Sequence, residues 1–209
     1  MKNLGLYIII DPNNIRNAGL YNLAKEIIEA GADTIQLRNK ESNDQEMIAQ
    51  ANLVKTLCRA NDTLFIINDR INVALETKPD GIHLGREDMD VNQCRKIFGD
   101  DFIIGNSNAT KQEAILSSKL NLNYVAIGSL FETTTKKDTI PSSINVIKDL
   151  KDNKFILPIV GIGGINKERA RKVLEFGADS LCISSAVTLS GNPRKEVLDI
   201  KKIMREYGK

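Results

Sequence analysis

Residues 156–187, ILPIVGIGGINKERARKVLEFGADSLCISSAV, contain in one stretch the pattern that decides the fold. The apolar, β-branched run at 156–160 predicts a strand, and the amphipathic stretch at 167–175 predicts a helix. A second apolar run at 180–184 predicts another strand. Two buried strands joined through a helix by short turns are typical of a parallel βαβ unit.

The same alternation extends from this stretch to both ends of the chain. Further apolar runs predict strands at 6–10, 34–38, 64–68, 81–84, 102–105 and 123–127. Amphipathic stretches between and after them predict helices at 20–30, 43–60, 71–76, 91–98, 110–119, 141–150 and 193–206. Together these segments make about eight βα units, the number in a TIM barrel.

Two α/β folds share this alternation, the closed barrel and the open doubly wound sheet. The first strand lacks the glycine-rich fingerprint of dinucleotide-binding sheets. The most unusual residues all follow strands, and in a barrel those strand ends meet at one mouth. We therefore predict a (β/α)₈ TIM barrel. With 209 residues and no linker or break in composition, residues 1–209 are expected to form a single domain.

Composition excludes several classes of partner. The net charge is only +2, with acidic and basic residues mixed along the chain, so neither nucleic acid nor a membrane surface is expected as a partner. The N-terminal run LGLYIII is too short to span a membrane and has no signal-peptide cleavage site, which favours a cytoplasmic protein. Cys58, Cys94 and Cys182 contain no close pair, so we expect buried free thiols.

Cationic side chains follow the second predicted strand, in the run QLRNK at 36–40. Strand alternation sends Gln36, Arg38 and Lys40 to one side. The guanidinium fork and the ammonium could clamp a diphosphate. The alternative is a solvated loop with two surface bases.

Carboxylates follow the third and fourth predicted strands, Asp69 after Asn68 and Asp88 in the run GRED. Consecutive strands of a barrel are neighbours, so the two carboxylates could stand close together. Such a pair suits Mg²⁺, which takes one or two protein carboxylates and substrate phosphates. The alternatives are helix caps or loop residues.

Anion-binding patterns follow the last three predicted strands. The loop at 128–136, GSLFETTTK, offers hydroxyl groups and Lys136, unless it is simply a polar loop. The glycine-rich run at 161–166, together with Ser184 and Ser185, lies where TIM barrels usually bind phosphate. The only histidine, His83, is interpreted as a hydrogen-bonded core residue rather than a catalytic base.

Seven runs between residues 36 and 187, taken in order, resemble the thiamine-phosphate synthase family. They are QLRNK, INDRINVAL, DGIHLGREDM, GNS, YVAIGSLFETTTKKD, PIVGIGGI and GADSLCISSAV. The resemblance implies a transferase of thiamine biosynthesis with a TIM barrel fold. Such an enzyme couples 4-amino-5-hydroxymethyl-2-methylpyrimidine diphosphate to thiazole phosphate, with Mg²⁺ as cofactor, and releases diphosphate.

The resemblance also implies which residues bind each substrate. The pyrimidine diphosphate would be held by Gln36, Leu37, Arg38, Asn39, Lys40, Asn68, Ser107 and Lys136. The thiazole phosphate would be held by Thr133, Thr134, Thr135, Gly164, Ser184 and Ser185. Asp69 and Asp88 would bind Mg²⁺, which bridges the diphosphate.

The implied reaction is a dissociative substitution. The catalytic residues would be Arg38, Lys40 and Lys136, which with Mg²⁺ can neutralise the departing diphosphate. The pyrimidine methylene becomes cation-like and the thiazole nitrogen captures it, so no protein nucleophile or base is required. The expected partners are these small molecules, and assembly into a homo-oligomer is left open.

Four positions depart from the family pattern, which often has His, Gln, Pro and Pro at Ala109, Arg86, Ser129 and Glu132. Two alternative functions share parts of this pattern. A thiazole tautomerase-like relative would rely on a histidine near Ala109, which is absent. A non-enzymatic regulatory barrel that only binds phosphate would not need the carboxylate pair Asp69 and Asp88.

Overall fold

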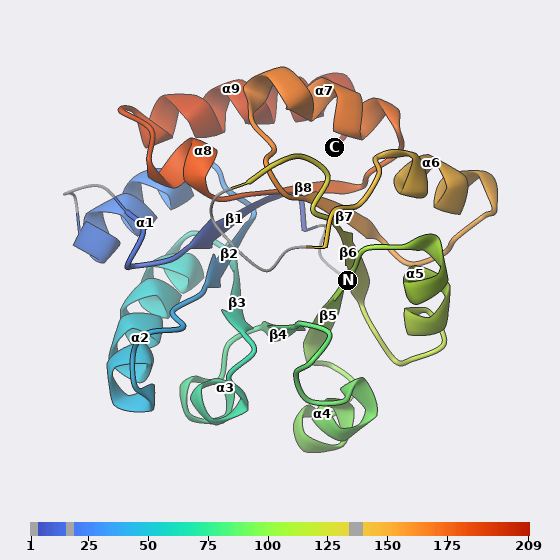
Figure 1. Cartoon of the computed structure of the whole chain (residues 1–209). Coiled ribbons are helices and arrows are strands. Elements are labelled where there is room, and N and C mark those ends of the chain that lie inside the picture. The colour runs from blue at the N-terminus through green and yellow to red at the C-terminus, as the bar shows by residue number, and fades with distance from the viewer. Residues whose placement is uncertain (1–3, 16–18, 134–139) are drawn as a thin grey trace.

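The computed structural model describes residues 4–15, 19–133 and 140–209, and they form a closed parallel barrel (Figure 1). Each strand pairs with the next in sequence, and the last pairs with the first. The strands are β1 (Leu6–Ile10), β2 (Thr34–Leu37), β3 (Leu64–Asn68), β4 (Gly81–Leu84), β5 (Ile103–Asn108), β6 (Tyr124–Ile127), β7 (Ile159–Ile162) and β8 (Ser180–Ile183). The predicted single-domain TIM barrel is therefore confirmed.

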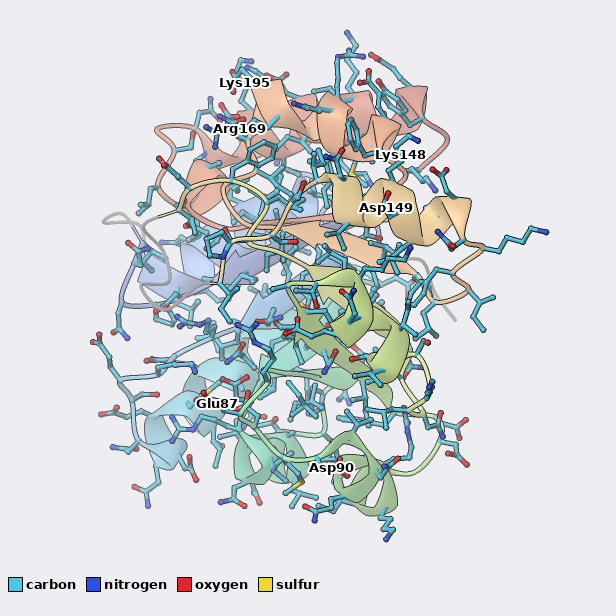
Figure 2. The ribbon with its side chains drawn as sticks, turned by 45° about the vertical axis from the view of Figure 1, so that its right-hand side comes forward. Glu87, Asp90, Lys148, Asp149, Arg169 and Lys195 are labelled. Atoms are coloured by element: carbon cyan, nitrogen blue, oxygen red, sulfur yellow. The ribbon has the colours of Figure 1, made fainter. Side chains whose placement is uncertain are left out.

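The helices form a ring outside the strands (Figure 1). They are α1 (Gly19–Glu29), α2 (Asp44–Ala60), α3 (Ile71–Thr77), α4 (Val91–Phe98), α5 (Lys111–Ser117), α6 (Asn145–Asp152), α7 (Lys167–Glu175), α8 (Ser185–Thr188) and α9 (Pro193–Glu206). Figure 2 shows charged side chains such as Lys148 and Lys195 on the outside of this ring. Within the described ranges, no helix has the length and apolar character that crossing a membrane requires.

The barrel buries side chains on both faces of its sheet. In β2, Ile35 and Leu37 join the apolar layer between strands and helices, whereas Gln36 is buried on the inner side. The inner layer includes Tyr7, Tyr124 and other residues that alternate with the outer ones. The three cysteines are free and buried, as predicted.

The largest differences from the prediction are three shifted boundaries and one additional helix. β7 begins at Ile159 instead of 156, because Pro158 precedes it and Ile156 is 87% exposed. α6 begins at Asn145 instead of 141, because the backbone of Ser142 pairs with Ser129. β5 extends through a polar run to Asn108. The short helix α8 was not predicted.

A repeated hydrogen-bond motif joins the strands in pairs at the end of the barrel where the strands begin. The residue before each even-numbered strand accepts, through its side chain, the N–H of a residue in the preceding strand. The pairs are Asp33 with Leu6 (2.7 Å), Asp80 with Phe65 (2.8 Å), Asn123 with Ile104 (2.8 Å) and Asp179 with Ile159 (2.9 Å). Each of the four also donates its own N–H to the carbonyl of the same partner. This reciprocal pairing stabilises the end of the barrel opposite the mouth.

Candidate active site

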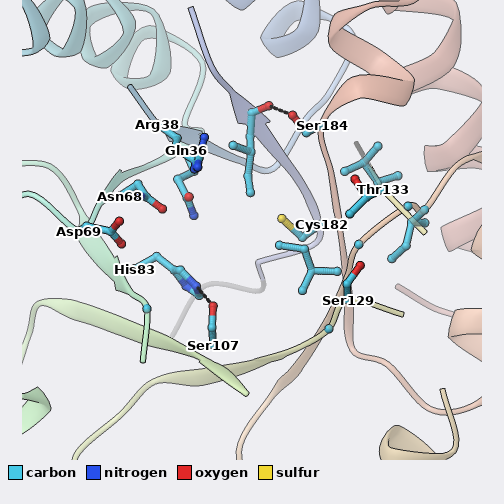
Figure 3. A pocket seen from close by; sticks show the side chains of 18 of the residues that line it. Gln36, Arg38, Asn68, Asp69, His83, Ser107, Ser129, Thr133, Cys182 and Ser184 are labelled. Carbon is cyan, nitrogen blue, oxygen red and sulfur yellow. Dashed lines mark hydrogen bonds between the residues drawn. The ribbon is translucent and has the colours of Figure 1, made fainter. Parts of the chain in front are cut away.

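A cavity of about 170 Å³ opens at the carboxyl ends of the strands (Figure 3). It is the position where TIM barrels carry their active sites. Eleven of the predicted site residues line it: Gln36, Arg38, Lys40, Asn68, Asp69, Asp88, Ser107, Thr133, Gly164, Ser184 and Ser185. Three others, Thr134, Thr135 and Lys136, lie outside the described residues.

Two predicted substrate-binding residues have side chains that do not line the cavity. Leu37 is fully buried between the barrel and its helices, because alternation along β2 turns it away from the side of Gln36. The Asn39 amide accepts a hydrogen bond from Asn13 Nδ2 at 2.7 Å and donates one to Gln50 Oε1 at 3.1 Å. Asn39 therefore holds the loop after β2 in place.

Both cations after β2 are paired with carboxylates. Arg38 Nη1 donates to Asp11 Oδ2 at 2.7 Å, and both side chains are largely buried. Lys40 Nζ lies 2.9 Å from Asp69 Oδ2, with the lysine about half exposed. Sequence analysis missed Asp11 as a site residue, although it directly follows β1 and the strand-end rule could have found it.

Asp69 and Asp88 share one end of the cavity and hydrogen-bond to each other. Burial, the hydrogen bond with Asp69 and the charge of Asp69 raise the pKa of Asp88 to about 6. Burial alone would raise the pKa of Asp69 too, but hydrogen bonds with Asp88 and Lys40 lower it. The pair therefore holds one proton between two carboxylates over much of the acidic range.

The helix-cap alternative for Asp69 is wrong, because the N-cap of α3 is Arg70. Asp69 itself has a φ of 59°, which directs its carboxylate toward Lys40 and Asp88. The Asp88 carboxylate also accepts the Gly85 N–H at 2.6 Å. In the described ranges no group of three or more His, Cys, Asp or Glu side chains could hold a metal. Two carboxylates nevertheless fit Mg²⁺, which fills its remaining positions with phosphate oxygens and water.

The opposite end of the cavity is formed by the loops after β7 and β8. Gly163 and Gly164 have φ values of 100° and 61°, which favour glycine. A Cβ on Gly164 would come within 2.4 Å of Glu132 O and 2.9 Å of Phe131 Cβ. The hydroxyl of Ser184 donates to Ile9 O at 3.0 Å, which ties β8 to β1 (Figure 3). This end has the glycines, hydroxyls and backbone turns of a phosphate site.

A chain of hydrogen bonds crosses the floor of the cavity. Gln36 Nε2 lies 2.6 Å from Tyr7 OH, which lies 3.1 Å from Tyr124 OH. His83 joins Tyr124 OH through Nδ1 and Ser107 Oγ through Nε2, each at 2.9 Å. The prediction of a buried, hydrogen-bonded His83 is confirmed. Sequence analysis missed the two tyrosines, because each resembles any other large residue in an apolar strand.

Two of the four positions that depart from the family pattern, Arg86 and Ser129, line this cavity. Arg86 lines it and lies 3.5 Å from Glu113 Oε1. Ala109 is buried after β5, and the Ser129 hydroxyl donates to Phe131 O at 2.7 Å. None of these side chains replaces Asp69 or Asp88.

Comparison with known proteins identifies the family. Residues 6–187 match the family model described as thiamine monophosphate synthase. The chain belongs to this family. A thiamine-phosphate synthase of Methanosarcina mazei is 40% identical over 99% of this chain and 85% of its own length. One from Methanosarcina barkeri is 38% identical over 94% of this chain and 88% of its own.

A solved structure agrees with this assignment. Thiamine phosphate pyrophosphorylase from Pyrococcus furiosus superposes with a TM-score of 0.89 at 33% identity, covering 98% of this chain and 97% of its own. The resemblance inferred from the seven sequence runs is thus confirmed. As a member of the thiamine monophosphate synthase family the chain is a transferase of thiamine biosynthesis, and neither alternative function is favoured.

Proposed function

We propose that the chain joins 4-amino-5-hydroxymethyl-2-methylpyrimidine diphosphate to thiazole phosphate and releases diphosphate. One observation carries this proposal beyond family membership. A single cavity connects a cation and carboxylate end, with Arg38, Lys40 and Asp69, to a glycine and hydroxyl end, with Gly164 and Ser184. Two substrates that each carry phosphate need two such ends facing one reaction space.

The diphosphate is assigned to the end formed by β2, β3 and β4. Arg38 Nη1 and Lys40 Nζ each pair with one carboxylate, and both side chains line the cavity, so their remaining N–H groups are placed to donate to a bound diphosphate. Arg38 offers a planar fork, held in orientation by Asp11. Lys136 belongs to the same proposal, although it lies outside the described residues.

Asp69 and Asp88 are the proposed ligands of Mg²⁺. The raised pKa of Asp88, caused by burial and by Asp69, indicates that the pair is short of positive charge. A divalent cation would offset that repulsion and, when bound, would neutralise charge on the departing diphosphate. Lys40, at 2.9 Å from Asp69, lies close enough to act on the same leaving group.

The thiazole phosphate is assigned to Thr133, Gly164, Ser184 and Ser185, together with Thr134 and Thr135. Bound there, its ring nitrogen would face the pyrimidine methylene. The C–O bond to the diphosphate breaks with its electron pair, and the nitrogen lone pair forms the new C–N bond. Both ring nitrogens of His83 are engaged by Tyr124 and Ser107, which fits a reaction that needs no protein base.

We also propose that residues 1–209 act as one cytoplasmic domain whose partners are these small molecules. The small net charge of +2 supports this view.

Product formation tests the function directly. The purified protein is mixed with both substrates, with Mg²⁺ or with a chelator in excess, and thiamine phosphate is measured by chromatography. We expect product only when Mg²⁺ and both substrates are present. Conversion of thiazole phosphate alone would indicate a tautomerase, and absence of product under all conditions would overturn the proposal.

A further inference from the structure

The floor of the cavity contains more polar structure than substrate contact requires. Tyr7 and Tyr124 are almost completely buried, and their rings meet edge to face with centroids 6.2 Å apart. The Tyr124 ring also stacks on His83 at 5.7 Å. Gly105 in β5 makes room for this ring, because a Cβ there would come within 2.0 Å of Tyr124 Cζ. Tyr7 and Tyr124 lie behind the cavity wall, whereas Gln36, His83 and Ser107 of the same hydrogen-bond chain line the cavity.

The direction of every hydrogen bond in this chain follows from its first member. The Nε2 of Gln36 can only donate, so Tyr7 OH accepts from it. Each buried hydroxyl must also place its own proton. Within the described residues the other hydrogen-bond partner of Tyr7 OH is Tyr124 OH, so Tyr7 donates to Tyr124, and by the same argument Tyr124 donates to His83 Nδ1. The imidazole proton is therefore on Nε2 and is donated to Ser107 Oγ. The Ser107 hydroxyl proton is left to point into the cavity.

Both phenols are able to donate in this way. Burial, and then the neighbouring Tyr124, raises the pKa of Tyr7, and burial raises the pKa of Tyr124. Each therefore keeps its proton at neutral pH. At the other end, the Oε1 atom of Gln36 is buried and accepts no hydrogen bond within the described part of the chain. A buried carbonyl oxygen without a donor is costly, so this end is built for a ligand that donates.

We propose that Tyr7, Tyr124 and His83 are positioning residues that orient Gln36 as an acceptor and Ser107 as a donor, and thereby select a 4-aminopyrimidine over a 4-oxopyrimidine. The inference rests on the proposed function, because it assumes that the pyrimidine lies over this floor. A 4-aminopyrimidine presents an N–H donor beside a ring nitrogen that accepts. The 4-oxo analogue presents the reverse, a carbonyl acceptor beside a ring N–H.

The hydrogen-bond chain gives the reversed donor and acceptor pattern a high free-energy cost. For Gln36 to offer its Nε2 to a 4-oxo ligand, the two tyrosine hydroxyls, the imidazole tautomer and the Ser107 hydroxyl would all have to reverse together. A site built to hydrogen-bond one pattern rejects the other because buried groups are then left unpaired. Cutting the chain at one tyrosine should remove this coupling and let the Gln36 amide rotate alone.

The imidazole tautomer tests the direction of the chain without any catalysis. His83 is the only histidine in the sequence, so nitrogen NMR of the ¹⁵N-histidine-labelled protein is unambiguous. We expect a protonated Nε2 and an unprotonated Nδ1 at neutral pH. A proton on Nδ1, or on both nitrogens, would overturn the proposal. In Tyr124→Phe the Nδ1 atom loses its donor, and we expect a mixture of tautomers.

Substrate preference tests the consequence. Values of kcat/KM are compared for the 4-amino and 4-oxo forms of the pyrimidine diphosphate. The preference of the unmodified protein for the amino form is expected to fall about tenfold or more in Tyr7→Phe and Tyr124→Phe. Tyr207→Phe is the matched control, since it loses only a hydroxyl that donates to Glu175 outside the barrel. It should keep the full preference.

Unchanged preference in both floor variants would overturn the proposal, even if their overall rates fell. Failure of the proposed function is a separate outcome, seen as no product from the natural substrates. In that case, calorimetric binding of the two pyrimidine diphosphates replaces kcat/KM. Equal affinity of the unmodified protein for both would then overturn the selection.

Discussion

At the scale of single residues, the position of Asp69 shows how the backbone prepares the site. Its φ of 59° is uncommon for a residue other than glycine, and among the other residues Asn and Asp tolerate it best. That conformation places the Asp69 carboxylate beside Lys40 and Asp88 instead of over the start of α3. A substitution that tests its charge should therefore keep its backbone preference, which favours Asn over Ala.

We predict that Asp69→Asn and Asp88→Asn each lower kcat/KM for coupling by about 100-fold or more, because each removes a charged ligand of the proposed Mg²⁺. Thermal unfolding should change little, since neither carboxylate packs in the apolar core. Steady-state assays at several Mg²⁺ concentrations provide the measurement. Activity close to that of the unmodified protein at limiting Mg²⁺ would rule out the metal assignment.

Asp90 provides the control for this pair. It lies two residues beyond Asp88, is exposed, and accepts the N–H groups of Asn92 and Gln93 as the N-cap of α4. Asp90→Ala should cost about 1 kcal/mol of stability and leave the coupling rate unchanged. A large loss of coupling rate in Asp88→Asn, with an unchanged rate but lower stability in Asp90→Ala, would separate the charge needed for catalysis from the charge needed for folding.

At the scale of secondary-structure elements, the loop after β7 depends on the loop after β6. Gly164 has no room for a side chain, because the backbone of Glu132 and the Cβ of Phe131 fill that space. A substitution there would move the segment leading to Thr133, not simply block the cavity. The two loops form the proposed phosphate end together.

Gly164→Ala is predicted to raise the KM for thiazole phosphate about tenfold or more, because a displaced loop no longer presents its donors correctly. Binding of the pyrimidine diphosphate, measured by calorimetry, should be nearly unaffected. Gly31→Ala is the control: its φ of 101° also favours glycine, but nothing lies within 4 Å of the added Cβ. Similar KM changes in both variants would mean that backbone strain, not loop position, causes the effect.

The paired strands at the opposite end of the barrel yield a prediction about stability alone. Asp80→Ala removes the acceptor of the Phe65 N–H and should cost about 1–3 kcal/mol in unfolding free energy. Asp80→Asn keeps an oxygen at this position and should cost less. Chemical denaturation measures both, and kcat should stay unchanged because the mouth is at the other end. A loss of kcat without loss of stability would contradict this division between the ends.

At the scale of the whole molecule, Asp179 ties together segments from three parts of the chain. Its carboxylate accepts Lys151 Nζ of α6 at 2.7 Å, the Ile159 N–H of β7 at 2.9 Å and Lys209 Nζ at 3.2 Å. Burial alone would raise the pKa of Asp179, but the hydrogen bonds from Lys151 and Ile159 lower it. The folded state therefore favours the ionised carboxylate more than the unfolded state does.

This difference gives barrel stability a pH dependence with a known sign. The contribution of Asp179 is present above the pKa of an unfolded aspartate, about 3.9, and is lost as the pH falls through the lowered folded pKa. Asp179→Asn should thus be destabilising near pH 7, and its difference from the unmodified protein should shrink below about pH 4. Denaturation across this range measures it, with Asp101→Asn, an exposed position, as control. A difference that does not vary with pH would contradict the ionic origin.

The sequence by itself determined that the fold is a barrel and that the functional groups lie at the carboxyl ends of its strands. Alternating apolar runs and amphipathic stretches are set by neighbours in the chain, so local pattern was enough to place nearly every strand and helix. The rule that functional groups follow strands then located Lys40, Asp69, Asp88 and Gly164 at one mouth. The predicted strand boundaries were wrong where the local sequence pattern was misleading, as at Pro158 before β7 and in the polar end of β5.

Only the tertiary structure decided which of these side chains meet. Arg38 lies against Asp11, Asn39 binds Asn13 and Gln50, and Tyr7 reaches Tyr124 across 117 positions of sequence. Such contacts depend on the closure of the sheet and on the face that each strand turns inward. No local periodicity encodes them, because these hydrogen-bond partners are far apart in sequence and meet only when the strands have paired into the barrel.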